Sequence, residues 1–381
     1  MMWDLETLRL LFWAMLGLVM MLTALNEGGA LGVLSLLPAL AEAEREQKAL
    51  RECLAPTGLA NLAWVIGFVM LLFAAWPIAY AIALASFYPV LLLWLLAVLL
   101  RPLGLYFLEE FAEPSWRKYA VRALFFSGWV PAVLLGVLAG NLLKGIPFHL
   151  DSDMHIRFLG DFAGLFNPFS LLVAATALAL FAMHGALFVQ LKIQGELRER
   201  AQSMAIKAGV SFVILFALTG LWIMHLEGYH VTSEIMPNAA SNPLAKFVKR
   251  SEGLWLDNYE HLPVLALIPG LAFVSAIAGI WLSRQNKAYW AMLASTLCLG
   301  LVVLTFGVSL FPFLLPSNIS LNSSLTIWDG SASLPALQIL LWATVVAVPV
   351  MALLSRWLWG WTVVTAVVAE EPVCVMPEGD D

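Results

Sequence analysis

One carboxyl group, that of Glu27, stands inside a long apolar stretch near the start of the chain. Asn26 precedes this acid, and Gly28 and Gly29 follow it. A charge inside a membrane is costly, so ionisable residues within apolar spans mark proton relays, ion pairs or substrate pathways. Glu27 is therefore the first candidate for chemistry, as a proton relay or as the partner of a basic residue. The alternative is that this part of the helix emerges into a polar crevice or a subunit interface.

Two histidines, His184 and His225, fall within or at the ends of apolar stretches. Two imidazoles at similar depth in a helical bundle would suit haem b. The expected spans place His184 in the inner half of one helix and His225 near the outer end of another. This mismatch favours polar contacts between helices over a haem held by this chain alone. The other four histidines are too scattered for a metal site, and three widely spaced cysteines suggest neither zinc nor a disulfide.

Several other polar and aromatic residues mark the ends of apolar stretches. Asn61 is a candidate member of a polar relay or crevice, and Trp64 and Trp76 are interpreted as structural or interface anchors. Arg101 closes a further stretch, where its charged end can reach the membrane surface. No P-loop, glycine-rich nucleotide motif or catalytic Ser/His/Asp spacing is present, so no catalytic residue is assigned.

The composition identifies the solvent in which these residues must lie. Of 381 residues, 61% are hydrophobic and 12% are charged. Soluble globular domains have roughly 45–50% apolar and about 25% charged residues, so the excess apolar surface of this chain must face lipid. The net charge of −6 argues against nucleic acid as a partner. Acids stand where a signal peptide needs a basic start, so the first helix is expected to be retained.

The pattern predicts an all-α integral membrane protein of about nine transmembrane helices, consistent with two four-helix bundles plus one extra helix. The first expected span is long enough to be broken or to project beyond the bilayer, and Gly28, Gly29 and Gly32 favour a kink or a close helix approach. The expected spans are 8–38, 58–80, 82–101, 120–141, 166–191, 206–226, 262–283, 289–312 and 335–361.

The basic residues predict the orientation of these spans. Fourteen of the 20 Lys and Arg fall in one set of connections and six in the other, so the first set is expected in the cytoplasm. The N-terminus is then outside and the C-terminus inside, with residues 362–381 as a cytoplasmic acidic tail. The connections 142–165 and 227–261 are expected to form ordered caps on the outer surface, whereas 196–202 is expected to be a solvated inner turn.

Ten short segments, in order, resemble subunit II of the cytochrome bd quinol oxidase family. The resemblance extends from about residue 4 to 361, and the order of the segments makes it specific. The segments are DLETLRLLFWAMLG, FAAWPIAYA, LLRPLG, GNLLKGIPF, FNPFSLL, ALTGLWIM, GYHV, ASNPL, LFPFLLPS and SLTIWD.

The resemblance implies a heterodimer in the cell (inner) membrane that oxidises quinol and reduces O2. The partner, subunit I, would hold haem b and haem d, and this chain would hold no haem or metal and no catalytic centre of its own. Membrane lipid surrounds such a complex, and the resemblance leaves room for a structural quinone and a small single-helix subunit.

The chain departs from the family pattern at acids associated with a proton path. The family has Asp-Gly-x-Asp in its first helix, whereas Glu27 keeps one acid here and Ala30 replaces the other. A His/Trp-Asp-Gly-Asn cluster is reduced to Asn61 and Trp64. Where the family has Phe-Asp-Tyr, this chain has Leu105, Tyr106 and Phe107. A phenol exchanges protons poorly near neutral pH, yet Tyr106 stays a candidate for the relay with Glu27 and Asn61.

Three alternatives to a working oxidase subunit remain open. A divergent paralogue in a haem-free complex explains the missing acids. A secondary transporter explains many helices with Gly and Pro breaks around an intramembrane acid. A purely structural membrane scaffold also needs no carboxylates.

Overall fold

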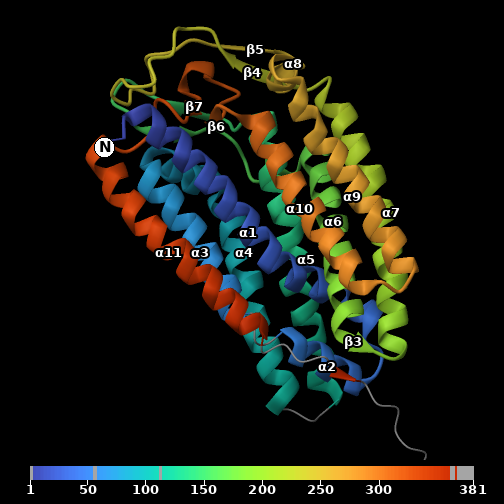
Figure 1. The fold of residues 1–381 in the computed structure, drawn as a ribbon. Helices are drawn as coiled ribbons and strands as arrows, with labels where there is room; N and C mark the ends of the chain where they lie inside the picture. Colours follow the sequence, from blue (N-terminus) through green and yellow to red (C-terminus); the bar gives the residue numbers. More distant parts are fainter. Residues whose placement is uncertain (1–2, 55–57, 111–113, 361–364, 367–381) are drawn as a thin grey trace, which may run out of the picture.

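The computed structural model describes residues 3–54, 58–110, 114–360 and 365–366 as a bundle of helices with short hairpins over one end (Figure 1). The hairpin end also holds the first described residues of the chain. The helices are α1 (Leu5–Leu40), α2 (Glu44–Leu54), α3 (Gly58–Ala75), α4 (Pro77–Glu110), α5 (Pro114–Lys144), α6 (Pro168–Lys192), α7 (Glu196–Ile223), α8 (Asp257–His261), α9 (Leu267–Arg284), α10 (Ala288–Leu310) and α11 (Leu334–Gly360).

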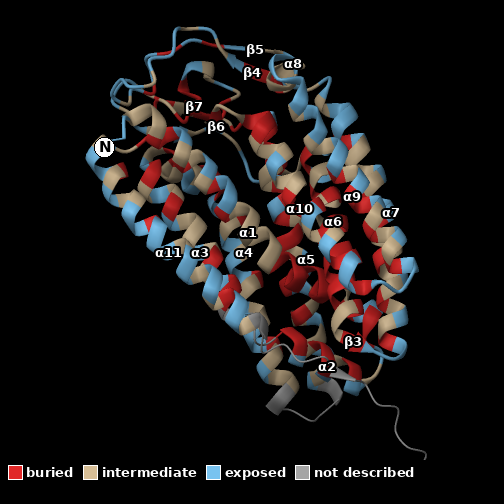
Figure 2. Ribbon diagram, viewed as in Figure 1, coloured by how far each residue is buried: buried red, intermediate tan, exposed pale blue. Residues whose placement is uncertain are grey.

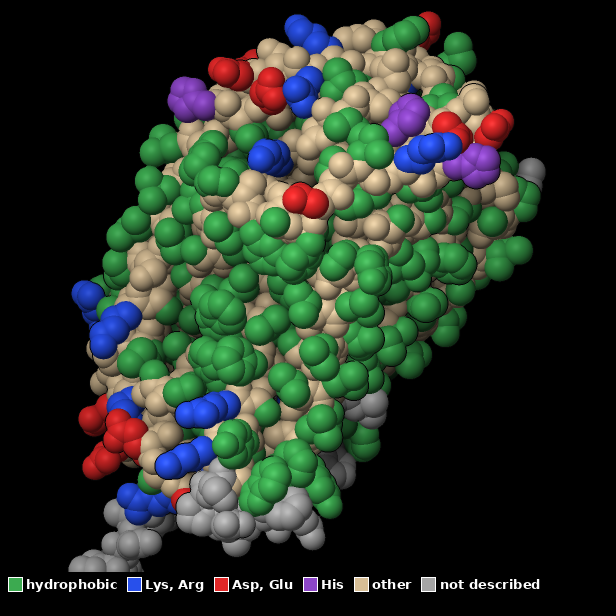
Figure 3. All heavy atoms as spheres, turned by 180° about the vertical axis from the view of Figure 1, so that it is seen from behind, with side chains coloured by type: hydrophobic (Ala, Val, Ile, Leu, Met, Phe, Trp, Pro, Cys, Tyr) green, Lys and Arg blue, Asp and Glu red, His purple; other side chains and the backbone are tan. Residues whose placement is uncertain are grey.

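Nine of these helices overlap the nine expected spans, one for each. Within the described chain, eight are long and apolar enough to cross a membrane, and the apolar part of α3, Ala60–Ala75, is shorter. At about 1.5 Å per residue, α3 measures about 27 Å, close to the hydrocarbon thickness of about 30 Å. Figure 3 shows a broad belt of apolar side chains between charged groups at the two ends. The expected all-α integral membrane fold is confirmed.

Two rings of four helices make up the bundle. Helices α1, α3, α4 and α5 contact one another in one ring, and α6, α7, α9 and α10 form the second. Helix α11 packs on α3 and α1 as the extra helix. The rings meet where α1 and α5 contact α6, and Figure 2 shows buried residues gathered there. Within the most apolar 18-residue stretch of each helix, 67% of the residues of α6 are buried, but only 11% of those of α11.

Glycine allows α1 and α6 to approach until their backbones touch. A Cβ atom on Gly32 would lie 1.9 Å from the carbonyl oxygen of Phe181, and one on Gly185 would lie 2.4–2.6 Å from the α1 backbone. A Cβ on Gly28 would meet the Phe181 ring at 2.9 Å, whereas one on Gly29 would meet nothing within 4 Å. Because α1 stays one helix of 36 residues, Gly28 and Gly32 serve close approach and not a break.

Several helices extend beyond their expected ends. The segment 196–202, expected to be a solvated turn, forms the first turns of α7, so that expectation was wrong. Gly195, with φ of 84°, turns the chain just before the helix, and Glu196 and Glu199 suit the positive end of the helix dipole. Helix α4 likewise runs over Pro77–Glu110 and not only over 82–101.

Three antiparallel hairpins form the cap over one end of the bundle. They pair β1 (Phe148–Leu150) with β2 (Ile156–Phe158), β4 (Glu227–Val231) with β5 (Val248–Glu252), and β6 (Phe313–Leu315) with β7 (Leu325–Thr326). At the opposite end, β3 (Ile193–Gln194) pairs in parallel with β8 (Thr365–Ala366). Apart from β8, the expected acidic tail at 362–381 lies outside the described residues.

Buried charges fasten this cap to the helices. Arg9, at the start of α1, is fully buried and donates to Ser331 Oγ at 2.8 Å and Ser241 Oγ at 3.0 Å. Lys246 Nζ lies 2.9 Å from the Asp329 carboxylate, with both side chains nearly buried. Burial lowers the pKa of Lys246 and raises the pKa of Asp329. Each ion therefore needs the other in order to remain charged inside the cap.

Replacing Asp329 by asparagine is expected to destabilise the folded protein by about 3–5 kcal/mol, since it leaves the Lys246 ammonium buried without a counter-charge. The measurement is the midpoint of thermal unfolding of the purified protein. Asp153→Asn, in an exposed part of the cap, is the matched control and should leave the midpoint unchanged. Equal midpoints for the two variants would contradict this role for the ion pair.

Candidate functional site

Glu27 and Arg101 face each other inside the bundle, between α1 and α4. Arg101 Nη2 lies 2.5 Å from Glu27 Oε1, and Nη1 lies 3.2 Å from Oε2, so the guanidinium donates two hydrogen bonds to the carboxylate. The two side chains are only 15% and 10% exposed. A bidentate pair is the stronger geometry for these ions, and its neutrality reduces the cost of burying charge. Arg101 therefore turns into the protein instead of reaching the membrane surface.

Unsatisfied polar atoms accompany this ion pair. Asn61 on α3 is 2% exposed, and neither its amide nitrogen nor its oxygen has a hydrogen-bond partner among the described residues. The Nε atom of Arg101 is likewise buried without such a partner. Buried polar groups of this kind are commonly satisfied by internal water, which needs two to four polar neighbours.

The packing of α3 on α1 places Asn61 at about the level of Glu27. Thr23 Oγ1 on α1 donates to the carbonyl oxygen of Trp64 at 3.1 Å. The two helices run in opposite directions, because the end of α3 and the start of α1 both meet residues 331–332. About one helical turn from the Thr23 contact, away from the hairpin cap, α1 carries Glu27 and α3 carries Asn61.

His184 forms the polar contact between helices that was expected of it. Its ring is 1% exposed, and Nδ1 lies 2.9 Å from Ser295 Oγ on α10. His225 follows the C-terminal end of α7, and the other four histidines lie in the hairpin cap and its connections. The histidines therefore offer no second imidazole at the depth of His184.

The three aromatic candidates differ in their surroundings. Trp64 and Trp76 make structural contacts, whereas Tyr106 lies on the surface away from the Glu27 pair. Trp64 is 1% exposed and donates to Ser355 Oγ on α11 at 2.6 Å. Trp76 is fully buried and donates to the carbonyl of Ile327 in the cap at 3.2 Å. Both indoles join elements of the fold and do not lie in a lipid-facing belt. Tyr106 is 55% exposed, packs edge-on to its neighbour Phe107, and is not brought to Glu27.

An apolar cavity of about 550 Å³ lies beside the N-terminal half of α1. Its walls come from α1, α3, α4, α5 and α10, with β6 at one end. Gly17 and Gly307 line it, and a Cβ atom on Gly17 would meet nothing within 4 Å. The cavity has the size and character of a site for a small apolar ligand.

Sequence reasoning identified Glu27 and Arg101 separately but missed that they pair. The signal was available, because each is a lone charge within or at the end of an apolar stretch and their signs are opposite. Ser295, the partner of His184, carried no such signal. Chemically, the site is either a fixed ion pair that stabilises the bundle or a carboxylate that exchanges protons through water near Asn61.

Comparison with known proteins gives consistent matches over the membrane part of the chain. A family model described as cytochrome bd terminal oxidase subunit II matches residues 8–362. Cytochrome bd-I ubiquinol oxidase subunit 2 of Escherichia coli K12 is 35% identical over 355 residues, which are 93% of this chain and 94% of that protein. The probable cytochrome oxidase subunit 2 of Haemophilus influenzae is also 35% identical, over 354 residues and the same shares of each chain.

A solved structure shares the fold. The bd oxidase from Geobacillus thermodenitrificans has a chain that aligns with a TM-score of 0.64 and 16% sequence identity. The alignment covers 92% of this chain and 98% of that chain. At this identity the likeness concerns the arrangement of helices alone.

Proposed function

From the premise that this chain belongs to the cytochrome bd terminal oxidase subunit II family, we propose how it works within a membrane quinol oxidase. The resemblance read from ten short segments is confirmed over residues 8–362, which include, apart from the first three residues of α1, the nine described helices that overlap the expected spans. This match is the observation that carries the functional conclusion. The chain is one subunit of a multi-pass inner-membrane oxidoreductase complex, and its partner is subunit I.

In this proposal the haems b and d belong to subunit I. The residues of this chain do not fit a haem held alone, because His184 is engaged by Ser295 and has no second histidine at its depth among the described residues. The chain then has no redox centre of its own. Its contribution is to hold the complex together and to supply polar groups inside the membrane.

Co-purification tests this assignment. An affinity tag on this chain, expressed with its neighbouring reading frame, should isolate a complex whose reduced-minus-oxidised spectrum shows haem b and haem d bands. Expression of this chain without subunit I should yield little stable protein. A stable, haem-free chain that purifies alone and transports a solute would instead support the transporter alternative.

The Glu27 pair supports a role in proton delivery. Ala30 and Tyr106 stand where the family carries acids, so Glu27 is the carboxyl group that remains in this part of the chain. Arg101 holds that carboxylate in one position, and the Asn61 amide can both donate to and accept from a water molecule. We place the proton route at Glu27, through water between α1, α3 and α4. Tyr106 is exposed on the outside of α4 and is given no part in this route.

The cavity beside α1 supports a bound structural quinone. Its lining is almost entirely aliphatic and aromatic, which suits an isoprenoid tail. The site holds this tail in place and is separate from quinol oxidation, which belongs to subunit I. The exposed apolar faces of the outer helices also leave room for a small single-helix subunit.

Filling the cavity should expel its ligand. Gly17→Leu places a side chain in open space inside the cavity and is expected to reduce co-purified quinone at least about fivefold, with the helices undisturbed. Quinone extracted from the purified complex is quantified by chromatography. Gly220→Leu also enters open space, but on α7 away from the cavity, and should leave the quinone content unchanged. Equal content in both variants would exclude this site.

The orientation proposed is N-terminus outside and C-terminus cytoplasmic. The support is the 14-to-6 division of Lys and Arg between the two sets of helix connections. Helix α2, with its basic residues, then lies at the cytoplasmic end, and the three hairpins cap the outer surface.

A further inference from the structure

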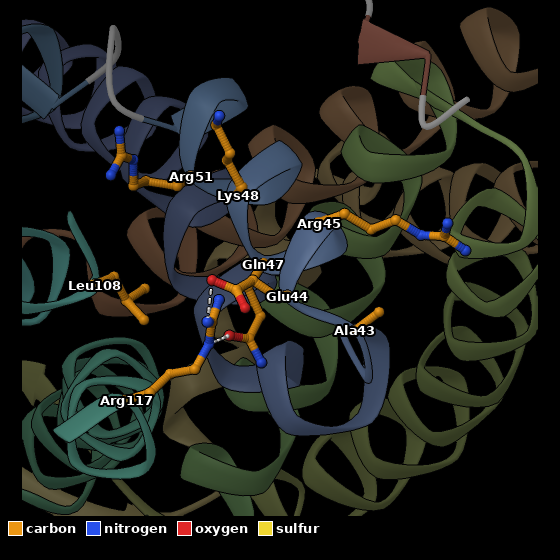
Figure 4. A pocket seen from close by; sticks show the side chains of 8 residues that line it. All are labelled: Ala43, Glu44, Arg45, Gln47, Lys48, Arg51, Leu108 and Arg117. Atoms are coloured by element: carbon orange, nitrogen blue, oxygen red, sulfur yellow. Dashed lines mark hydrogen bonds and ion pairs between the residues drawn. The ribbon is translucent and has the colours of Figure 1, made fainter. Parts of the chain in front are cut away.

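A basic pocket lies at the end of the bundle that carries α2. Its volume is about 870 Å³, and its lining comes from α2 and the segment before it, the inner end of α4 and the start of α5 (Figure 4). Four of the eight lining residues are cations and one is an acid. The lining residues are Ala43, Glu44, Arg45, Gln47, Lys48, Arg51, Leu108 and Arg117.

Helix α2 is held firmly, so its cations have fixed positions. Glu46, nearly buried, accepts hydrogen bonds from the backbone nitrogens of Glu42 and Ala43, both at 2.9 Å, and forms an ion pair with Arg200 of α7. The apolar side of α2, including Leu50 and Cys53, is buried in the core beneath it. The opposite side of the helix carries the basic residues of the pocket.

On one side of α2, the pocket places two arginines beside an apolar side chain, that of Leu108. Figure 4 shows Arg51 and Arg117 on the side of α2 where Leu108 lies, whereas Arg45 extends away on the other side. Arg117 is oriented by an ion pair with Glu44 and by donating to Gln47 Oε1 at 3.0 Å. Lys48 is exposed and makes no hydrogen bond or ion pair with any described residue.

Aromatic side chains beside the pocket mark the depth of lipid headgroups. Tyr106 contacts Phe107 with ring centroids 6.0 Å apart, Phe107 stacks on Trp116 at 6.1 Å, and Trp116 contacts Tyr119 at 6.3 Å. Such aromatic rows lie at the boundary between hydrocarbon and headgroups. They occupy the ends of α4 and α5 that also supply Leu108 and Arg117 to the pocket.

The exposed side of α4 continues from this level into the membrane. Leu99, Leu103 and Tyr106, spaced by about one helical turn, are each at least half exposed. Leu108 follows Leu99 by nine residues, about two and a half helical turns, so it lies on the opposite side of α4 and lines the pocket with the cations. The apolar strip therefore places the inner end of α4, and the pocket beside it, at the edge of the lipid.

We propose that this pocket binds the phosphate headgroup of an anionic phospholipid of the cytoplasmic leaflet. Lys48, Arg51 and Arg117 provide the positive charge, and guanidinium groups match phosphate oxygens in geometry. Basic pockets at the cytoplasmic side of membrane helices are suited to anionic headgroups in this way. The lipid would fasten α2 and the inner ends of α4 and α5 to the membrane surface.

Lipid titration of the delipidated two-subunit complex tests the proposal. Native mass spectrometry measures the binding of dioleoyl phosphatidylglycerol and, separately, dioleoyl phosphatidylcholine. Lys48→Gln with Arg51→Gln should weaken binding of the first phosphatidylglycerol about tenfold or more. The control, Lys207→Gln with Arg284→Gln, removes two exposed cations from the same end of the bundle and should change that affinity less than twofold.

Three outcomes would overturn the proposal. Equal losses in the pocket and control variants would mean that only general surface charge attracts the lipid. Equal binding of phosphatidylcholine would mean that the cations are not used. Displacement of phosphatidylglycerol by 10 mM inorganic phosphate would identify a free-phosphate site instead. If the double variant fails to assemble, the single exposed substitution Lys48→Glu is used, and unchanged phosphatidylglycerol affinity in it contradicts the site.

Discussion

Replacing Glu27 by glutamine is expected to slow quinol-dependent O2 reduction by the complex by about tenfold to a hundredfold. The physical reason is that an amide cannot take up and release a proton, and loss of a positioned proton-transfer group commonly costs 10² or more in rate. Turnover is measured as O2 uptake per haem, so that a smaller yield of complex does not count as slower chemistry. Glu27→Asp keeps the acid and should retain most of the turnover.

The ion pair complicates this experiment, because Glu27→Gln also leaves Arg101 without its partner inside the membrane. A variant with both Glu27→Gln and Arg101→Gln is neutral at the site and separates the two roles. If Glu27 only balances charge, the double variant recovers both assembly and turnover. If Glu27 carries protons, the double variant recovers assembly while turnover per haem stays low. Full turnover in the double variant would remove Glu27 from the proton route.

The second large effect concerns the contact of α1 with α6. Gly32→Ala is expected to destabilise the bundle by about 3 kcal/mol, the upper end of the usual range for overpacking, because the new Cβ would overlap the Phe181 carbonyl. A backbone atom cannot rotate away, so the two rings of helices must move apart. The measurement is thermal unfolding of the purified complex, together with the yield of assembled complex.

Gly29→Ala provides the control for this substitution. It lies three residues earlier in the same buried part of α1, but its Cβ would meet nothing within 4 Å. Alanine favours a helix over glycine by up to about 1 kcal/mol, so Gly29→Ala should be neutral or slightly stabilising. Similar losses of stability in Gly29→Ala and Gly32→Ala would show that the close approach does not limit the packing.

The helices of this protein could be predicted from its sequence because lipid imposes a simple requirement. A spanning helix needs a long apolar stretch, and the nine stretches each became a helix. The glycines of α1 also indicated a close approach, since small residues permit helix backbones to touch. The ends of helices were less predictable, because α7 begins in a charged segment where the apolar signal is absent.

The partners of individual side chains could not be predicted. Glu27 and Arg101 are 74 residues apart, and nothing in the local sequence says which span faces which. The same holds for Trp64, which contacts Ser355 on a helix 291 residues away. A tryptophan at a helix end usually lies in the membrane interface, whereas the packing of α1 and α11 on α3 buries this one.

The central claim is that this chain works as a subunit of a quinol-oxidising complex, and O2 uptake tests it most directly. The complex is isolated through a tag on this chain from cells that lack other quinol oxidases, and O2 consumption is recorded before and after a reduced quinol is added. We expect uptake that begins with the quinol and scales with the amount of haem d. A haem-containing complex that consumes no O2 with any quinol, or a complex that contains no haem, would contradict the claim.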